Sequence, residues 1–270
     1  MQSNRLATTL KALASICLIA SLVGCATSPP PIKTEVATKI NRVAVVSMTA
    51  KSFSRQYTGL TVFGNEQEEI DISDWKIDAQ YEDYIRNQLK NNSDLDVVAA
   101  PYAEEEFSRI NDSKGPWQSM VSKGPNFEAI ESATKSYCTN NSLDAVFVVA
   151  KARSEDFIAG TNQFFGGAGI YSRGPIDKSA NLHLISKVAL IDCTTAKPIA
   201  IRPLTSKQSG LYGDIIRSSP LLSINFEESL IPIQQWSPDQ KQRIQSELSK
   251  LPNLALSETL KSILPSKYRY

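Results

Sequence analysis

Two short, continuously apolar runs constrain the fold of this chain more than any other feature. They are residues 43–46, Val-Ala-Val-Val, and residues 145–149, Ala-Val-Phe-Val-Val. A half-exposed strand alternates apolar and polar residues, so runs without a polar position are typical of strands that are covered on both faces. Residues 182–190 alternate instead, as in a longer strand with two different faces. The sequence therefore predicts an α/β fold, with a mixed sheet flanked by helices.

Apolar residues at helical spacing predict the helices that cover this sheet. The clearest amphipathic stretch is residues 73–89, which follows a second extended piece expected at residues 60–63. Two further helices are expected near the C-terminus, at residues 237–251 and 254–264. The first of these opens with Ser-Pro, which is a favourable N-cap followed by a favourable first helical residue.

The length and composition suit one domain with an extension. The chain has 270 residues, of which 41% are hydrophobic and 21% are charged, so it can bury a sizeable core. We expect a mixed α/β domain at residues 40–205 and a C-terminal extension with helices at residues 206–270.

The N-terminal residues have the pattern of an export signal. The first 24 residues contain no Asp or Glu, carry Arg5 and Lys11, and continue as an uncharged stretch over residues 12–23. About twenty apolar residues are needed to span a bilayer as a helix, so this stretch is too short for a permanent transmembrane anchor.

The end of this stretch, Leu22-Val23-Gly24-Cys25, resembles the lipobox of bacterial lipoproteins. The resemblance implies that residues 1–24 are removed and that Cys25 receives lipid, whose several acyl chains anchor the protein stably in a membrane. Residues 25–39 then form the lipidated cysteine and a flexible, proline-bearing tether. The alternative is an ordinary secretory signal with a chance cysteine.

The residue after Cys25 indicates the membrane to which such a lipoprotein is sorted. It is Ala26 rather than Asp, which in enterobacterial lipoproteins implies passage to the outer membrane. We therefore expect a protein that is lipid-anchored in the outer membrane and faces the periplasm.

The order of lipidated cysteine, tether, apolar strand and helix also resembles curli-secretion-type lipoproteins over roughly a third of the chain. This resemblance lies in the pattern rather than in a motif, so it implies no site residues and no pore.

The net charge argues against nucleic acid as a partner. The whole chain carries 29 basic and 28 acidic residues. Removing Arg5 and Lys11 with the signal leaves 29 − 2 = 27 basic residues against 28, a net charge of −1. A near-neutral domain does not attract nucleic acid by bulk charge.

The cysteines fit an oxidising compartment. Cys17 leaves with the signal and Cys25 is lipidated, so the mature domain keeps Cys138 and Cys193. Cys138 ends a helix-like segment just before one predicted strand, and Cys193 ends a later strand that can run antiparallel to it. We therefore predict a Cys138–Cys193 disulfide, and the alternative is two buried thiols that never meet.

No motif identifies an enzyme, a cofactor site or a metal site. The single histidine, His183, lies in an alternating strand, where we expect it to be partly exposed rather than a catalytic base. Structural zinc needs four Cys or His ligands, so a chain with a single histidine lacks the ligands for most zinc sites. Glycines at residues 166–169 lack the order of a dinucleotide loop, and no Gly-x-Ser-x-Gly elbow occurs.

Acidic residues gather before and within the helix predicted at residues 73–89. Their order matches no EF-hand loop, so we expect a solvated helix start whose acids complement the helix dipole, rather than a calcium site. A hydrolase that uses carboxylates would be favoured if two acids converged in a cleft with a raised pKa. The acids are Glu66, Glu68, Glu69, Asp71, Asp74, Asp78, Glu82 and Asp83.

Residues 154–180 form the most unusual stretch, which we expect to be a long loop. Loops longer than about fifteen residues are usually functional or disordered, and aromatic and arginine side chains often carry the binding energy of interfaces. We therefore predict partner binding through Phe164, Phe165, Tyr171 and Arg173. The alternatives are contact with lipid and packing on the same domain.

These observations predict a non-enzymatic binding or assembly component of the cell envelope. Its partners would be the membrane, through the N-terminal lipid, and an envelope protein. The alternatives are the carboxylate hydrolase and a carrier of small ligands, which would need an enclosed apolar pocket.

Overall fold

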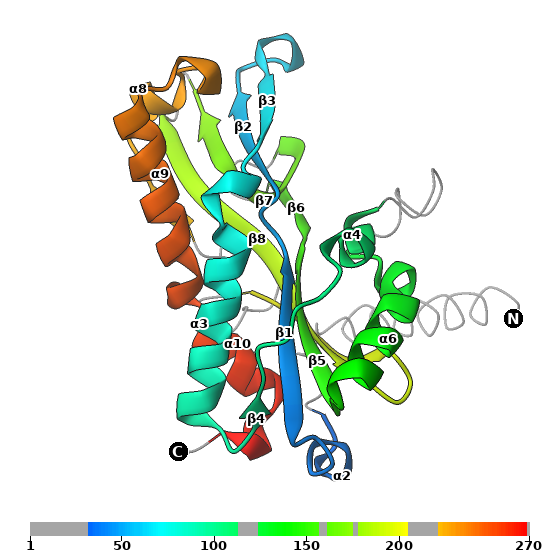
Figure 1. The fold of residues 1–270 in the computed structure, drawn as a ribbon. Helices are drawn as coiled ribbons and strands as arrows, with labels where there is room; N and C mark the ends of the chain where they lie inside the picture. Colours follow the sequence, from blue (N-terminus) through cyan, green and yellow to red (C-terminus); the bar gives the residue numbers. More distant parts are fainter. Residues whose placement is uncertain (1–31, 113–123, 157–160, 175–177, 205–220, 269–270) are drawn as a thin grey trace, which may run out of the picture.

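The computed structural model describes residues 32–112, 124–156, 161–174, 178–204 and 221–268. The expected signal sequence and Cys25 lie outside these ranges. The fold is α/β, as predicted: a curled mixed sheet is flanked by helices and followed by a C-terminal helical segment (Figure 1).

Within the described ranges, ten strands form the sheet, and its main path runs in the order β3-β2-β7-β8-β5-β1-β4. β1 is parallel to β4 and β5, and β2 is parallel to β7, whereas the other pairs are antiparallel. The strands are β1 Arg42–Met48, β2 Ser52–Thr58, β3 Glu66–Asp71, β4 Asp96–Val97, β5 Ala145–Lys151, β6 Arg153–Asp156, β7 Thr161–Arg173, β8 Ser179–Asp192, β9 Lys197–Pro203 and β10 Leu221–Ser223.

The α-helices are α2 Thr34–Ala37, α3 Ile77–Asn92, α4 Glu104–Ser108, α6 Glu131–Asn141, α8 Phe226–Ser229, α9 Pro238–Lys250 and α10 Leu256–Ile263. Short 3-10 helices are η1 Val62–Gly64, η2 Ser73–Trp75, η3 Arg109–Asn111, η4 Phe127–Ile130, η5 Ile233–Gln235, η6 Leu251–Leu254 and η7 Pro265–Lys267. α9 begins as predicted, because the Ser237 hydroxyl accepts from the Gln240 N–H and the Gln240 side chain accepts from the Ser237 N–H.

The long strand β8 joins the two halves of the sheet. Its first half pairs with β7 and β10, and its second half pairs with β5 and β9. The change of neighbours falls between Ile185, which pairs with β7, and Ser186, which pairs with β5. Because one strand serves both halves, the helices on one face share a continuous core.

Both faces of the central strands are buried, as the apolar runs predict. In β1, Val43 and Val45 belong to a core with α3, α9 and α10, whereas Ala44 and Val46 belong to a core with α4 and α6. Figure 1 shows these two groups of helices on opposite sides of the sheet. The C-terminal helices therefore pack on the same core as the rest of the domain.

Three local expectations are wrong. Residues 60–63 are not extended but form a turn that contains η1. The end of the expected flexible tether forms α2, which packs on the body through Ala37 (1% exposed). The expected long loop at residues 154–180 is largely two strands, β6 and β7, because β7 finds partners in β2, β6 and β8 that the sequence does not reveal.

Candidate functional site

Two large apolar side chains are exposed at the tip of the β2–β3 hairpin. Phe63 is 96% exposed and Leu60 is 66% exposed. Both lie in the turn of residues 59–65, which we call the hairpin tip and which projects from one end of the molecule (Figure 1). Single exposed apolar residues need no explanation, so the feature that makes this turn a candidate contact surface is that two of them share it.

The backbone of the hairpin tip is held in place. The Gly59 N–H donates to the Asn65 side chain at 3.0 Å, and the Gly64 N–H donates to the Thr61 carbonyl at 3.0 Å. A Cβ on Gly59 would lie 2.8 Å from the Gly64 carbonyl oxygen, so the close approach of the two chain segments requires glycine. The turn therefore presents its apolar side chains on an ordered backbone, which lowers the entropic cost of binding.

A buried arginine fastens the base of this hairpin. The Arg55 side chain, 1% exposed, donates to Glu66 at 2.8 Å, to Glu68 at 2.7 Å and to the Ser229 carbonyl at 3.3 Å. Burial disfavours the charged guanidinium, but the hydrogen bonds with the two glutamates outweigh it and raise the pKa of Arg55. The same bond from Arg55 is the main cause that lowers the pKa of Glu68.

A polar pocket of about 250 Å³ lies at the carboxyl end of β1, beside the start of α3. Asp78 accepts hydrogen bonds from the Ser47 hydroxyl at 2.6 Å and from the N–H groups of Thr49 at 2.8 Å and Ala50 at 3.1 Å. This carboxylate therefore fixes the connection between β1 and β2.

Glu82 lies one helical turn after Asp78 and lines the same pocket. It accepts from the Ser47 N–H at 3.0 Å and from the Tyr102 hydroxyl, and Arg86 lies 3.4 Å away. Burial raises the pKa of Glu82, and burial together with Glu82 raises the pKa of Tyr102. The expected solvated helix start is thus wrong for Glu82, because β1 and Tyr102 cover it.

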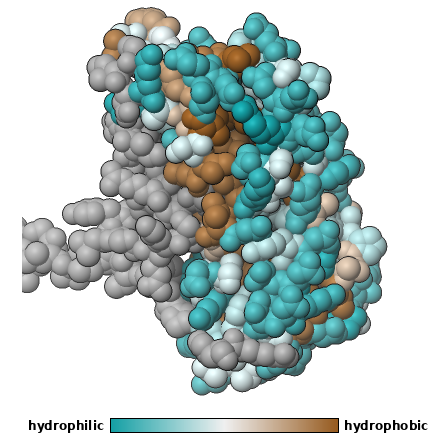
Figure 2. All heavy atoms as spheres, turned by 90° about the vertical axis from the view of Figure 1, so that its left-hand side faces the viewer, coloured by the Kyte–Doolittle hydropathy of each residue, from teal (hydrophilic) through white to brown (hydrophobic). Residues whose placement is uncertain are grey.

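A groove of about 260 Å³ lies between β10, α8 and α9. Its apolar lining comes from Leu222, Ile224 and Ile244, and Arg243 forms an ion pair with Glu228 beside them. Figure 2 views this side of the molecule and shows hydrophobic residues gathered in a band beside hydrophilic ones. The described residues form an open groove here, not the enclosed apolar pocket that a small-ligand carrier would need.

The residues predicted to bind a partner lie in β7. The backbones of Phe164 and Phe165 pair with β6, and their side chains lie outside the described part of the structure. Tyr171 is 2% exposed between β2 and β8, so it offers almost no surface to a partner. Arg173 is half-buried and pairs with Thr58, next to the hairpin tip. A partner role for these residues stays a prediction.

Sequence reasoning missed Leu60 and Phe63, which it assigned to a strand. The pair Gly59 and Gly64 was a signal that residues 60–63 form a turn, because glycines punctuate loops.

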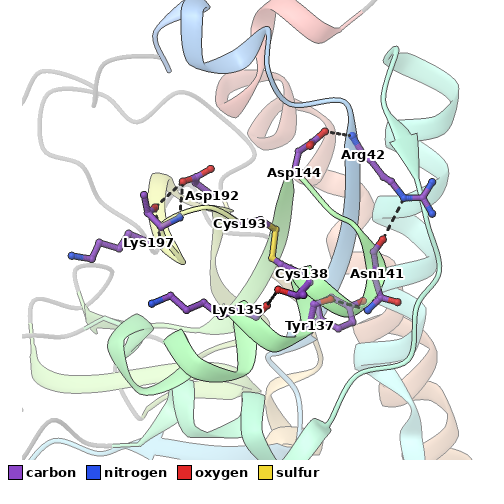
Figure 3. The surroundings of a disulfide bond; sticks show 11 residues. Arg42, Lys135, Tyr137, Cys138, Asn141, Asp144, Asp192, Cys193 and Lys197 are labelled. Carbon is purple, nitrogen blue, oxygen red and sulfur yellow. Dashed lines mark hydrogen bonds between the residues drawn. A yellow bond between two sulfur atoms is a disulfide. The ribbon is translucent and has the colours of Figure 1, made fainter.

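The predicted disulfide is confirmed. Cys138 on α6 is bonded to Cys193, which follows β8, and their Cα atoms lie 5.6 Å apart (Figure 3). The antiparallel pairing of β5 with β8 brings the two cysteines to the same edge of the sheet, as expected. Asp144, between α6 and β5, accepts the N–H groups of Asn41 and Arg42 and so ties this edge to the start of β1.

His183 is fully buried, which corrects the expectation of partial exposure. It lies in β8 between Gly169 of β7 and Leu221 of β10, and its Nδ1 lies 3.0 Å from the Gly167 carbonyl oxygen. Burial lowers its pKa to about 4, so the imidazole is neutral at pH 7.

The described residues contain neither a candidate metal cluster nor a candidate membrane-spanning helix. No group of three or more His, Cys, Asp or Glu side chains in these ranges is placed to hold a metal ion. No helix within the same ranges combines the length and the apolar character needed to cross a membrane.

No protein-family model and no curated protein matches the chain. Among solved structures, the chain is similar to a dodecamer of a PelC variant from Paraburkholderia phytofirmans, with a TM-score of 0.33 and 10% sequence identity. The match covers 87% of this chain and 94% of the other. A likeness of this size carries no argument about function.

Proposed function

We propose that this chain is an outer-membrane-anchored periplasmic lipoprotein that acts as a non-enzymatic binding or assembly component of the cell envelope. The export pattern of residues 1–24 and the lipobox-like Cys25 support the anchor. The observation that carries the binding role is the exposure of Leu60 and Phe63 on an ordered turn.

The position of the hairpin tip suits such a role. The expected tether leads into α2, which lies at the opposite end of the molecule from the hairpin tip (Figure 1). β1 and β2 follow one another between these ends, and their 7 + 7 = 14 strand residues at about 3.3 Å each span roughly 46 Å. A protein anchored near α2 can therefore present its hairpin tip well away from its own anchor.

The energetics favour a contact at this place. Burying a Phe or Leu side chain contributes about 1.5–3 kcal/mol, so covering both side chains of the hairpin tip would contribute roughly 3–6 kcal/mol before the costs of association. Interface energy is commonly concentrated in a few such anchor residues.

The test is photo-crosslinking in intact cells with a photoreactive amino acid in place of Phe63. The matched control carries the same probe at Lys90, an exposed position on α3. The proposal expects a discrete envelope protein to be captured from position 63 and not from position 90. Identical captures from both positions, or none from position 63, would overturn the binding role of the hairpin tip.

The carboxylate hydrolase is the second candidate, and the raised pKa of Glu82 beside Asp78 favours it. Against it, main-chain N–H groups of the β1–β2 region already engage both carboxylates. The test incubates the full chain and its Glu82→Gln variant with purified peptidoglycan and measures released reducing ends and peptides. Release by the wild type that the variant abolishes would establish the hydrolase and refute the non-enzymatic proposal.

A further inference from the structure

The polar pocket beside α3 has an unusual arrangement of charge. At its floor lies Glu82, which is 9% exposed, together with the half-buried Asp78. Main-chain N–H groups and hydroxyls satisfy these carboxylates, but the only cation that pairs with either of them in the described part of the chain is Arg86, 3.4 Å from Glu82. The floor of the pocket is therefore rich in negative charge that lacks a strong cationic partner.

The rim of the same pocket has the opposite balance. It carries the exposed residues Lys51, Lys76 and Glu104. The charge of Lys51 helps to lower the pKa of Asp71, which does not line the pocket, and Lys76 has no ion pair or hydrogen bond of its side chain among the described residues. Among the exposed residues that line the pocket, two ammonium groups stand against one carboxylate, so this lining is positive at the rim and negative at the floor.

The place and size of the pocket suit a small ligand. It opens at the carboxyl end of β1, which is parallel to its neighbours β4 and β5, and this is the edge of α/β sheets where ligands commonly bind. About 250 Å³ holds a small organic molecule rather than a polymer segment. Tyr102 and Ser47 supply hydroxyl groups at the floor.

We infer that this pocket binds a small zwitterion, with its ammonium group at Glu82 and its carboxylate at Lys51 and Lys76. A ligand ammonium group is the best partner for a buried carboxylate without a full counter-charge, because it is compact, carries the opposite charge and donates three hydrogen bonds. The rim lysines attract the carboxylate in the more solvated half of the pocket. The site is separate from the hairpin tip and does not depend on the function proposed for it.

The test titrates the purified full chain, in detergent, with ω-amino acids from glycine to 6-aminohexanoate, followed by calorimetry. Butylamine and butyrate serve as probes that carry only one of the two charges. The structure predicts saturable binding with an optimum at one chain length, and binding of each single-charge probe weaker by about tenfold or more. No saturable binding of any ω-amino acid, or equal binding of butylamine, would overturn the inference.

Two variants locate the ligand. Lys76→Gln should lower the affinity for the best-binding ω-amino acid by about tenfold and leave the affinity for butylamine unchanged. Lys90→Gln, at an exposed lysine on α3, should change neither affinity. Glu82→Gln should remove the preference for an ammonium group. Lys76 is exposed, so its variant keeps the test decisive even if Glu82→Gln fails to fold. Unchanged affinity in Lys76→Gln would place the ligand elsewhere.

Discussion

The buried guanidinium of Arg55 lies 2.7 Å from a carboxylate oxygen of Glu68, whose other oxygen accepts the Ile233 N–H at 2.8 Å. The Glu68 side chain thus joins β2 and β3 to the C-terminal segment at η5. Replacing it tests how firmly the hairpin is held.

Glu68→Gln should destabilise the fold by about 1–3 kcal/mol, because a charge-assisted hydrogen bond to a buried cation is weakened. Glu66→Gln is the matched control, and it should cost at most about 1 kcal/mol because Glu66 is 60% exposed. The measurement is chemical denaturation at pH 7. Equal losses in the two variants would contradict the role given to Glu68.

The Arg55–Glu68 pair also predicts how the stability of the fold changes at low pH. The pKa of Glu68 is lowered in the folded protein, so its stabilising contribution is present above its ordinary value of 4.5 and is lost as pH falls through the folded pKa. Glu68→Gln should therefore lose less stability than the wild type when the pH is lowered below about 4.5. Parallel stability curves over this range would refute the prediction.

The Cys138–Cys193 disulfide should stabilise the fold mainly through the unfolded chain. It closes a loop of 55 residues, which corresponds to about 4 kcal/mol in the chain-entropy model. Reductant should lower the melting temperature of the wild type. The double variant Cys138→Ser, Cys193→Ser should melt at the lower temperature with or without reductant. A wild type that is insensitive to reductant under partly denaturing conditions would count against the bond.

His183 should make the protein sensitive to mild acid. Its folded pKa of about 4 lies below the ordinary value of 6.5, so the unfolded state binds the proton first and stability falls between these two values. The shift corresponds to a loss of about 3 kcal/mol as pH drops from 7 to 4. In the His183→Gln variant, the unfolding free energy should not show this fall between pH 7 and pH 4, whatever the stability of the variant at pH 7. An unaltered slope would show that other groups cause the acid sensitivity.

Phe63 should contribute almost nothing to folding. Because its side chain is 96% exposed, Phe63→Ser should change the unfolding free energy by no more than about 0.5 kcal/mol. Phe53 provides the contrast on the same hairpin, since it is fully buried against Trp75 and Trp236 and its replacement by Ala should cost about 3–5 kcal/mol. A large loss in Phe63→Ser would make this residue structural rather than a binding residue.

Cys25→Ala should abolish lipid attachment and leave an uncleaved precursor, because the thiol is the group that the lipobox resemblance assigns to lipid. Cys17→Ala is the matched control inside the expected signal and should be processed normally. Electrophoretic mobility and incorporation of labelled palmitate distinguish the two. Normal processing and membrane attachment of Cys25→Ala would refute the anchor.

Much of the core was predictable, because apolar periodicity reports burial directly. The runs at residues 43–46 and 145–149 became β1 and β5, and the pattern at residues 237–251 became α9 with its capping box. The strand pairing of β7 was not predictable, since its glycines and aromatic residues match no simple period. Its parallel partner β2 lies more than a hundred residues earlier in the chain, although its antiparallel partner β8 is the next strand.

The sequence by itself determined the α/β class, the buried strands and the cysteine pair, because local patterns of apolar residues and the placement of two thiols at strand ends suffice for these. Only the tertiary structure decided that Phe63 is exposed, that His183 and Arg55 are buried, and that Glu82 lines a pocket. The physical reason is that exposure and charge environment depend on which distant segments cover a residue. Local sequence does not encode the contact between Tyr102 and Glu82, or the one that Glu68 makes with η5.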